Sequence, residues 1–213
     1  MKIAKNSKLV MIGDSITDAG RAQPVGEAGG LGTGYVACVD ALLGAACPEA
    51  AIRVVNVGTS GNTVRDLKAR WQRDVIDLGP DWLSVMIGIN DVWRQFDLPH
   101  AGEIHVGLPE YEQTLDDLVG RVRPGLKGLV LMTPYFLELN RQDAMRARMD
   151  AYSAAVKRLA AKHDAVFVDT QAAFDAILAT CHPAAIAGDR VHPNHVGHMV
   201  LARAFLKAID FAW

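Results

Sequence analysis

The chain has 213 residues, of which 50% are hydrophobic and 22% are charged. This length suits one domain, 1–213, with a sizeable core, and the composition excludes disordered and fibrous proteins. Lysine and arginine number 22 against 24 aspartates and glutamates, a formal net charge of -2, so we expect no nucleic-acid partner.

In chain order the sequence predicts alternating strands and helices, because short apolar runs alternate with longer amphipathic ones. We expect a strand at 8–12, a helix at 34–46, a strand at 52–57, a helix at 63–78, a strand at 82–87, a helix at 109–122, a strand at 128–132, a helix at 142–162, a strand at 165–168, and helices at 170–180 and 194–209. The longest stretches without a periodic pattern are 18–32, 91–108 and 181–193.

The predicted strands are nearly continuous in apolar residues instead of alternating, which is typical of a parallel sheet buried on both faces. Strand–helix units in series favour a doubly wound, flavodoxin-like α/β/α sandwich with a five-stranded parallel sheet. Such a fold binds its ligands at the carboxyl ends of the strands. The residues that follow each strand are therefore the ones to inspect.

The cysteines and the N-terminal segment indicate a reduced, cytoplasmic protein. The three cysteines are widely spaced and form neither a disulfide framework nor a Cys-x-x-Cys pair. The apolar run Leu9–Ile12 is too short for a signal peptide, and a membrane span needs about 20 apolar residues. We therefore expect no membrane partner.

Polar residues and glycines follow the predicted strands. The segments are Gly13–Asp18, Gly58–Asn62, Gly88–Asp91 and, before the last helix, Asp189–Pro193. A hydrolytic serine needs a base, a group that orients the base, and donors for the oxyanion. These segments contain all of them.

Ser15 is the leading candidate nucleophile because it directly follows a strand, and Gly13 leaves room for a substrate to approach. Ser60 is the one rival at a strand end, since the other serines fall within a strand, within a helix or near the N-terminus. A serine after a strand more often caps a helix or forms a turn. The Gly-Asp-Ser string is therefore weak evidence by itself.

His192 is the candidate base and Asp189, three residues earlier, the group that orients it. The backbone N–H groups of Ser15 and Gly58 and the side-chain amide of Asn90 are candidate oxyanion donors. Each has a structural alternative: a surface aspartate and histidine, a strand-end turn at Gly58, and an Asx turn at Asn90. The functional interpretation depends on these groups arriving together at one edge of the sheet.

Metal and nucleotide sites are weaker alternatives. His192, His195 and His198 are spaced three apart, but Pro193 breaks the helical register that would align them. The glycine-rich segment 29–34 precedes a helix but lacks the lysine of a phosphate-binding loop. We expect no metal ion and no cofactor.

Taken in order, four blocks of the sequence resemble those of the SGNH or GDSL-type hydrolases, which are named for the Ser, Gly, Asn and His of these blocks. The blocks are Gly13-Asp14-Ser15-Ile16, Gly58, Gly88-x-Asn90-Asp91 and Asp189-x-x-His192-Pro193. Ile16 replaces the leucine of the name motif, a conservative change. Five further stretches are similar to the bacterial intracellular acetylxylan esterases of this family: 12–18, 60–67, 86–94, 131–134 and 189–213.

The resemblance implies that Ser15 is the nucleophile, His192 the base and Asp189 its partner, with an oxyanion hole from Ser15, Gly58 and Asn90. It implies the SGNH hydrolase fold and a metal-independent carboxylic ester hydrolase of the acetylxylan esterase type. The expected substrate is an acetylated xylo-oligosaccharide small enough to be imported. The resemblance also implies a homo-oligomer, either a dimer or a larger assembly built from dimers.

Asp14, Trp93 and Arg94 are our candidates for contact with the sugar, because they neighbour the catalytic blocks. Trp93 is equally well explained as a core or interface residue. Two alternatives stay open at this point. One is an esterase, lipase or thioesterase acting on other small acyl esters, and the other is a non-catalytic carbohydrate-binding protein on the same fold.

Overall fold

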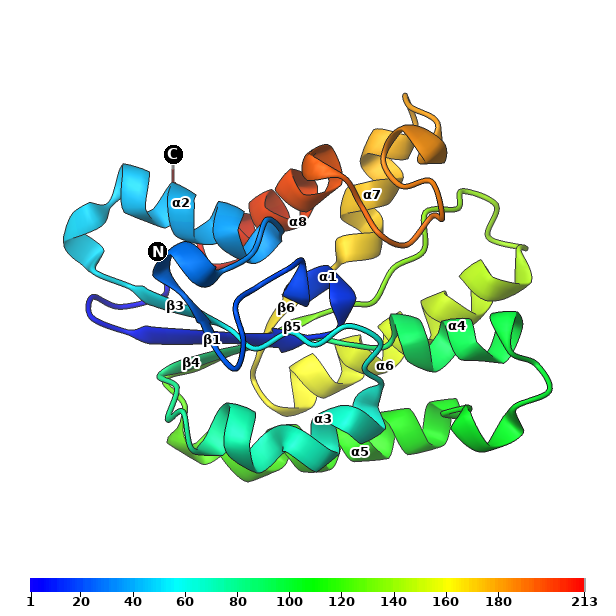
Figure 1. Ribbon diagram of the computed structural model, residues 1–213, viewed down its shortest axis with the longest axis horizontal. Helices are drawn as coiled ribbons and strands as arrows, with labels where there is room; N and C mark the ends of the chain where they lie inside the picture. Colours follow the sequence, from blue (N-terminus) through cyan, green and yellow to red (C-terminus); the bar gives the residue numbers. More distant parts are fainter. Residues whose placement is uncertain (213) are drawn as a thin grey trace.

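A central sheet of six strands organises the computed structural model, which describes residues 1–212 of the chain (Figure 1). The strands are β1 Lys8–Gly13, β2 Gly26–Glu27, β3 Arg53–Asn56, β4 Trp82–Met86, β5 Gly128–Met132 and β6 Val166–Val168. Their spatial order is β2-β3-β1-β4-β5-β6, and the pairs are parallel except β2 with β3. The predicted parallel α/β sheet is confirmed.

The strand β2 corrects the predicted number of five strands to six. It lies within 18–32, where the sequence shows no periodic pattern, and it pairs antiparallel with β3 through Gly26 and Glu27. Two residues are too few to show an alternating pattern. The Glu27 carboxylate also accepts hydrogen bonds from the Arg53 guanidinium, which ties this edge of the sheet together.

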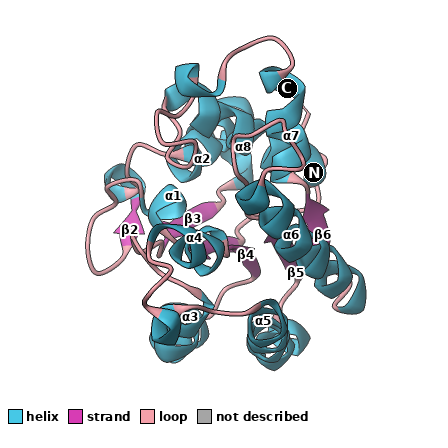
Figure 2. Ribbon diagram, turned by 90° about the vertical axis from the view of Figure 1, so that its right-hand side faces the viewer, coloured by secondary structure: helices cyan, strands magenta, loops and turns pink. Residues whose placement is uncertain are grey.

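Helices cover both faces of the sheet. Their bounds are α1 Ser15–Asp18, α2 Tyr35–Ala46, α3 Val64–Trp71, α4 Ile89–Asp97, α5 Leu108–Val122, α6 Ala144–Lys162, α7 Thr170–Leu178 and α8 His195–Ala208. Figure 2 shows α2, α7 and α8 above the sheet and α3 and α5 below it, with α6 beside β5 and β6. The helices α1 and α4 follow β1 and β4 and lie in front of the sheet in this view. No helix within residues 1–212 is both long and apolar enough to cross a bilayer.

The strands are buried on both faces, as the continuous apolar runs predict. All five residues of β4 and all five of β5 are buried, and β1 is buried from Leu9 onward. Full burial of each valine or leucine contributes about 1.5–3 kcal/mol. The carboxyl ends of β1, β4 and β5 are therefore held by a well-packed core.

The helix α4 was not predicted, because 91–108 was expected to be irregular. Its apolar residues Ile89, Val92, Trp93 and Phe96 do have helical spacing. However, only Ile87 and Gly88 separate β4 from α4. Gly88 marks the end of the strand, but no Ser, Thr, Asp or Asn precedes Ile89 to signal the start of a helix.

The predicted helix 63–78 begins as expected and changes geometry partway. Thr63 and Asp66 form the predicted capping box. After Trp71 the helix continues as a π-helical turn over Gln72–Ile76. The remaining predicted helices begin and end within two residues of their observed bounds.

Replacing Gly13 by alanine is expected to destabilise the fold. An added Cβ would lie 2.3 Å from both Met86 O and Thr17 Oγ1, and overpacking of this kind costs about 1–3 kcal/mol. Gly44→Ala in α2 is the control: a Cβ there meets nothing within 4 Å, and alanine in a helix is favoured by about 0.5–1 kcal/mol. Urea unfolding measures both variants. Equal stability of Gly13→Ala and the wild type would contradict the close packing.

Candidate active site

Ser15, His192 and Asp189 form a continuous chain of hydrogen bonds. Ser15 Oγ lies 2.8 Å from His192 Nε2, and His192 Nδ1 lies 2.6 Å from Asp189 Oδ2. Asp189 Oδ1 also accepts the backbone N–H groups of Val191 and His192, at 2.9 and 2.8 Å. The carboxylate thereby orients the imidazole so that Nε2 faces the serine hydroxyl. In this arrangement a histidine can take the proton of the hydroxyl.

Ser15 is the first residue of α1, directly after β1 and Asp14. Asp14 caps this helix, because its Oδ1 accepts the backbone N–H of Ile16 at 3.0 Å. Ile16 and Thr17 are buried, whereas Ser15 is half-buried. The serine hydroxyl therefore reaches the surface from a backbone that is fixed by its neighbours.

The loop that carries His192 is held by the segment after β5. Tyr135 Oη donates to Val191 O at 3.0 Å, and the Leu137 N–H donates to Arg190 O at 3.0 Å. Tyr135 and Leu137 are fully buried. These bonds connect the loop to the core of the sheet.

The carboxylate of Asp189 is favoured in its ionised form. Burial alone would raise its pKa, but the hydrogen bonds from the side chain and backbone of His192 and from the Val191 N–H outweigh burial and lower the pKa. An ionised carboxylate stabilises the positive charge that an imidazole gains when it accepts a proton.

Asn90 lies in the first turn of α4 with its side-chain amide already oriented. Asn90 Nδ2 donates to Asn62 O at 3.0 Å. An amide nitrogen carries two N–H groups, so the second remains for another acceptor. The N–H of Ser15 stands at the start of α1, where no intrahelical acceptor is present. Both groups can therefore serve as oxyanion donors.

The backbone N–H of Gly58, a predicted oxyanion donor, already has a hydrogen-bond partner within the protein. Its N–H donates to Asn56 Oδ1 at 2.9 Å, so it reaches a substrate oxygen only by sharing or exchanging that bond. A Cβ at this position would lie 2.2 Å from Asp18 N and 2.6 Å from Thr17 C. A glycine is therefore required for α1 to lie against this loop, whatever its N–H binds.

Asp14 is not available to a sugar, contrary to the prediction. Its exposed fraction is 1%, and its carboxyl group faces the protein interior. Burial raises the pKa of Asp14 to about 7, and the Ile16 N–H and the charge of His192 lower it only in part. The carboxyl group of Asp14 therefore holds α1 in place and does not contact ligand.

Trp93 and Arg94 lie beside the triad on α4, and both are half-buried. The ring centroids of Trp93 and His192 are 5.9 Å apart, with the planes tilted by 53°. The Arg94 guanidinium carbon lies 5.2 Å from the Trp93 ring centroid, and Arg94 Nη2 lies 3.4 Å from Asn90 Oδ1. An aromatic ring thus lies beside the imidazole, with a cation on that ring, and their contact with substrate stays a prediction.

The histidines of 192–198 do not form a metal-binding group. His198 Nδ1 accepts the Tyr35 N–H at 3.2 Å, and burial lowers the pKa of His198 to about 4. Over the part of the chain that the structure describes, no three His, Cys, Asp or Glu side chains are arranged to hold a metal ion.

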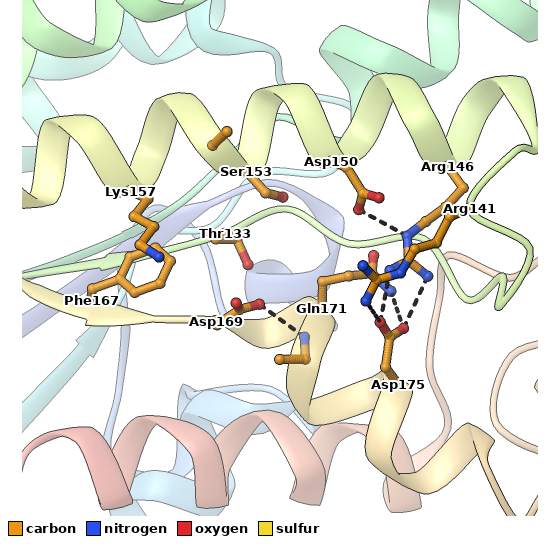
Figure 3. A pocket seen from close by; sticks show the side chains of 12 residues that line it. Thr133, Arg141, Arg146, Asp150, Ser153, Lys157, Phe167, Asp169, Gln171 and Asp175 are labelled. Atoms are coloured by element: carbon orange, nitrogen blue, oxygen red, sulfur yellow. Dashed lines mark hydrogen bonds and ion pairs between the residues drawn. The ribbon is translucent and has the colours of Figure 1, made fainter.

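A second polar cluster fills a pocket between α6 and α7, and none of the triad residues lines it. Figure 3 shows Arg146 there with Asp150 and Asp175. Arg146 Nε lies 2.9 Å from Asp150 Oδ1, and Nη2 lies 2.7 Å from Asp175 Oδ2. The pair with Asp150 lies within α6, and the pair with Asp175 joins α6 to α7.

Sequence reasoning did not single out Asn62 and Arg70, which complete the site. Arg70 lies on the face of α3 that buries Val64, Leu67 and Trp71, and it is 9% exposed. A charged residue on the apolar face of an amphipathic helix is the signal that could have identified it. Asn62 has no comparable signal apart from its place after a strand.

Comparison with known proteins agrees with this geometry. The family model described as "GDSL-like Lipase/Acylhydrolase family" matches residues 11–200. An acetylxylan esterase from Geobacillus stearothermophilus is 61% identical over 215 residues, covering 100% of this chain and 98% of that protein.

Solved structures resemble the chain equally closely. The crystal structure of an acetylxylan esterase from Geobacillus stearothermophilus has a TM-score of 0.99 at 61% identity, covering 100% of this chain and 98% of that one. Three related structures are described as catalytic mutants in which a serine, a histidine or an aspartate is replaced by alanine. An α/β hydrolase from the metagenome of Lake Arreo has a TM-score of 0.97 at 57% identity, covering 99% and 98%.

Asp14→Asn is expected to change how stability depends on pH. Since burial raises the pKa of Asp14 to about 7, the folded state keeps a proton that the unfolded state releases near the ordinary aspartate pKa of 3.8. The free energy of unfolding that this group contributes therefore falls as pH rises through this window, by at most about 1.4 kcal/mol per pH unit. The asparagine variant lacks this dependence.

Urea unfolding of both proteins between about pH 5 and about pH 7 measures the difference. The stability of Asp14→Asn relative to the wild type should increase with pH. Asp91, whose pKa burial also raises to about 7, titrates in the same range, and the charge of Asp14 contributes to raising that pKa. The comparison is therefore repeated in an Asp91→Asn background, where only Asp14 remains to titrate. A constant difference across this range would show that Asp14 does not carry the proton.

Proposed function

The chain belongs to the GDSL-like lipase/acylhydrolase family, and from that premise we propose that it is a serine esterase that removes acetyl groups from acetylated xylo-oligosaccharides. The observation that carries the chemistry is the 2.8 Å contact between Ser15 Oγ and His192 Nε2, continued by His192 to Asp189. The substrate class is supported by the 61% identity with an acetylxylan esterase over the whole chain. The chemistry uses side chains and backbone groups of this chain alone.

Ser15 attacks the acetyl carbonyl carbon while His192 takes the hydroxyl proton at Nε2. Asp189 stabilises the imidazolium that forms. The ester bond to the sugar then breaks, and His192 gives the proton to the departing sugar oxygen. This leaves an acetyl group on Ser15. Water, activated by the same imidazole, repeats the sequence and releases acetate.

The negative charge that develops on the carbonyl oxygen needs donors. The Ser15 N–H and the second N–H of Asn90 are the available ones, and the Gly58 N–H is a third that shares its bond with Asn56. Each preorganised donor of this kind is worth about 100- to 1000-fold in rate. These donors account for a large part of the acceleration we propose.

The sugar is proposed to bind along the first turns of α4. Trp93 offers a ring beside His192, and Arg94 offers a guanidinium next to that ring. Ligand sites combine apolar surface with a few polar groups that fix orientation, and this pair provides both. Asp14 takes no part because it is buried.

Three further properties stay predictions. A single domain, 1–213, is supported by one sheet and one hydrophobic core over the described residues 1–212. The cytoplasmic location is proposed from the cysteine spacing and the family resemblance, and the homo-oligomer, a dimer or a larger assembly built from dimers, from the family resemblance alone.

Ser15→Ala and His192→Ala should each lower kcat for release of acetate from acetylated xylo-oligosaccharides by about 10⁴-fold or more, because the triad acts as a unit. Ser60→Ala is the matched control: Ser60 also follows a strand, but its hydroxyl donates to Asp18 Oδ2 at 2.9 Å. We expect Ser60→Ala to stay within about threefold of the wild type, since it removes no transition-state contact. Near-normal turnover by folded Ser15→Ala would refute the assignment of the nucleophile.

Trp93→Ala should lower kcat/KM for acetylated xylo-oligosaccharides by about tenfold, as expected for loss of an aromatic contact. Trp93→Phe keeps a ring beside His192 and should retain most of the activity. Steady-state kinetics with both variants provides the measurement. If alanine and phenylalanine give the same kcat/KM as tryptophan, the sugar binds elsewhere.

A further inference from the structure

A buried guanidinium joins three segments of the site. Arg70 Nη2 donates to Gly13 O at 2.8 Å, Nη1 donates to Val57 O at 2.6 Å, and Nε donates to Asn62 Oδ1 at 2.6 Å. Gly13 ends β1, Val57 follows β3, and Asn62 lies in the segment before α3. One side chain, 9% exposed, thus connects the ends of two adjacent strands and the loop beyond them.

Two of these bonds orient backbone next to oxyanion donors. The C=O of Val57 and the N–H of Gly58 belong to one planar peptide unit, so a bond to Val57 O also sets the direction of the Gly58 N–H. The C=O of Gly13 lies just before the turn that presents Ser15. Arg70 therefore fixes the approach to both backbone donors.

The third bond reaches the side-chain donor through a relay. Arg70 holds the Asn62 side chain, and the Asn62 backbone carbonyl in turn accepts Asn90 Nδ2 at 3.0 Å. That bond occupies one N–H of the Asn90 amide and fixes the direction of the other. The guanidinium thus reaches Asn90 through Asn62, binds the peptide that contains the Gly58 N–H, and binds the carbonyl two residues before Ser15.

The charge of Arg70 is balanced on the side away from the substrate. Asp74, 4% exposed, places Oδ2 at 2.8 Å from Arg70 Nη1. Asp74 lies in the π-helical turn, a geometry often found near functional sites. Burial would raise the pKa of Asp74, but hydrogen bonds from Arg73 and Arg70 outweigh it and lower the pKa. The positive charge of Arg70 is therefore neutralised by Asp74 and does not have to be paired with a negative charge on the substrate.

We propose that Arg70 is a positioning residue for the oxyanion hole, acting through the Val57–Gly58 peptide, the Gly13 carbonyl and the Asn62–Asn90 relay. This inference rests on the proposed esterase function. The four acceptors, which are Gly13 O, Val57 O, Asn62 Oδ1 and Asp74 Oδ2, need a planar guanidinium with several N–H groups. The single ammonium nitrogen of a lysine has the same charge but cannot span them.

Arg70→Lys is the direct test, because it retains a positive charge beside Asp74. With para-nitrophenyl acetate we expect kcat to fall about 100-fold, the usual effect of displacing a catalytic group by about 1 Å. KM should change by less than about threefold, because the lost interactions act on the transition state. Asn62→Ala removes the half-buried side chain that accepts Arg70 Nε and leaves the Asn62 carbonyl in place; it should lower kcat about tenfold and serves if Arg70→Lys folds poorly.

Arg123→Lys is the matched control. Arg123 also binds backbone carbonyls through a partly buried guanidinium, with Nε 2.6 Å from His163 O, but it lies near the amino ends of β5 and β6. Its replacement should lower the melting temperature without changing kcat. If kcat falls as much in Arg123→Lys as in Arg70→Lys, the Arg70 effect is explained by a general loss of stability and the positioning role is wrong.

A double-mutant cycle with Asn90→Ala separates positioning from structure. If Arg70 acts through Asn90, the combined loss of kcat in Arg70→Lys/Asn90→Ala is smaller than the product of the two single losses. Independent, multiplicative losses would overturn the relay, as would an Arg70→Lys variant with wild-type kcat.

The substrate pair distinguishes failure of this inference from failure of the proposed function. A wild type that cleaves para-nitrophenyl acetate but not acetylated xylo-oligosaccharides would contradict the substrate and still allow Arg70 to be tested. A wild type that cleaves both, with unchanged kcat in Arg70→Lys, would overturn the role of Arg70 alone. A wild type that cleaves neither ester overturns both.

Discussion

The carboxyl edge of a parallel sheet leaves backbone carbonyls that need partners, and in this protein two buried arginines provide them. Arg70 binds Gly13 O and Val57 O, and Arg21 Nε donates to Gly58 O at 2.6 Å. Gly13 O also accepts the Thr59 N–H at 3.0 Å, whereas a buried carbonyl left with no donor at all would cost about 1–3 kcal/mol. The hydrogen bonds that satisfy these backbone carbonyls therefore also fix the positions of the proposed reacting groups. At this edge of the sheet the same contacts contribute to stability and to reactivity.

The strands and the catalytic residues could be predicted because their signals are local. A strand such as 128–132 appears as an uninterrupted apolar run, and the structure has the same bounds. Ser15 and Asn90 each follow a strand within a short polar segment, so topology brings them to one edge. His192 lies in a polar segment before the last helix, and its sequence signal is the aspartate three residues earlier. The structure adds the distances between them, which no spacing in the sequence contains.

The parts that escaped prediction depend on contacts between distant segments. Arg70 and Gly13 are separated by 57 positions in the sequence, so only the folded chain shows that they meet. Asp14 is polar and follows a strand, which suggests exposure, but α1 closes over it and leaves 1% of it accessible. The strand β2 has two residues and forms only because β3 lies beside it. In each case tertiary packing overrides the local pattern.

The helix α4 carries the proposed oxyanion donor and the proposed sugar contacts on successive turns. Asn90 lies in its first turn, Trp93 lies on the next one beside His192, and Arg94 follows Trp93. Inserting or deleting one residue between β4 and α4 would rotate all three by about 100° about the helix axis. With the proposed binding of the sugar along α4, relatives of this enzyme should differ in sugar preference by substitution along this helix, while the length of the connection stays constant. We expect the side chains on α4 to vary among relatives, and the number of residues between β4 and α4 to stay the same.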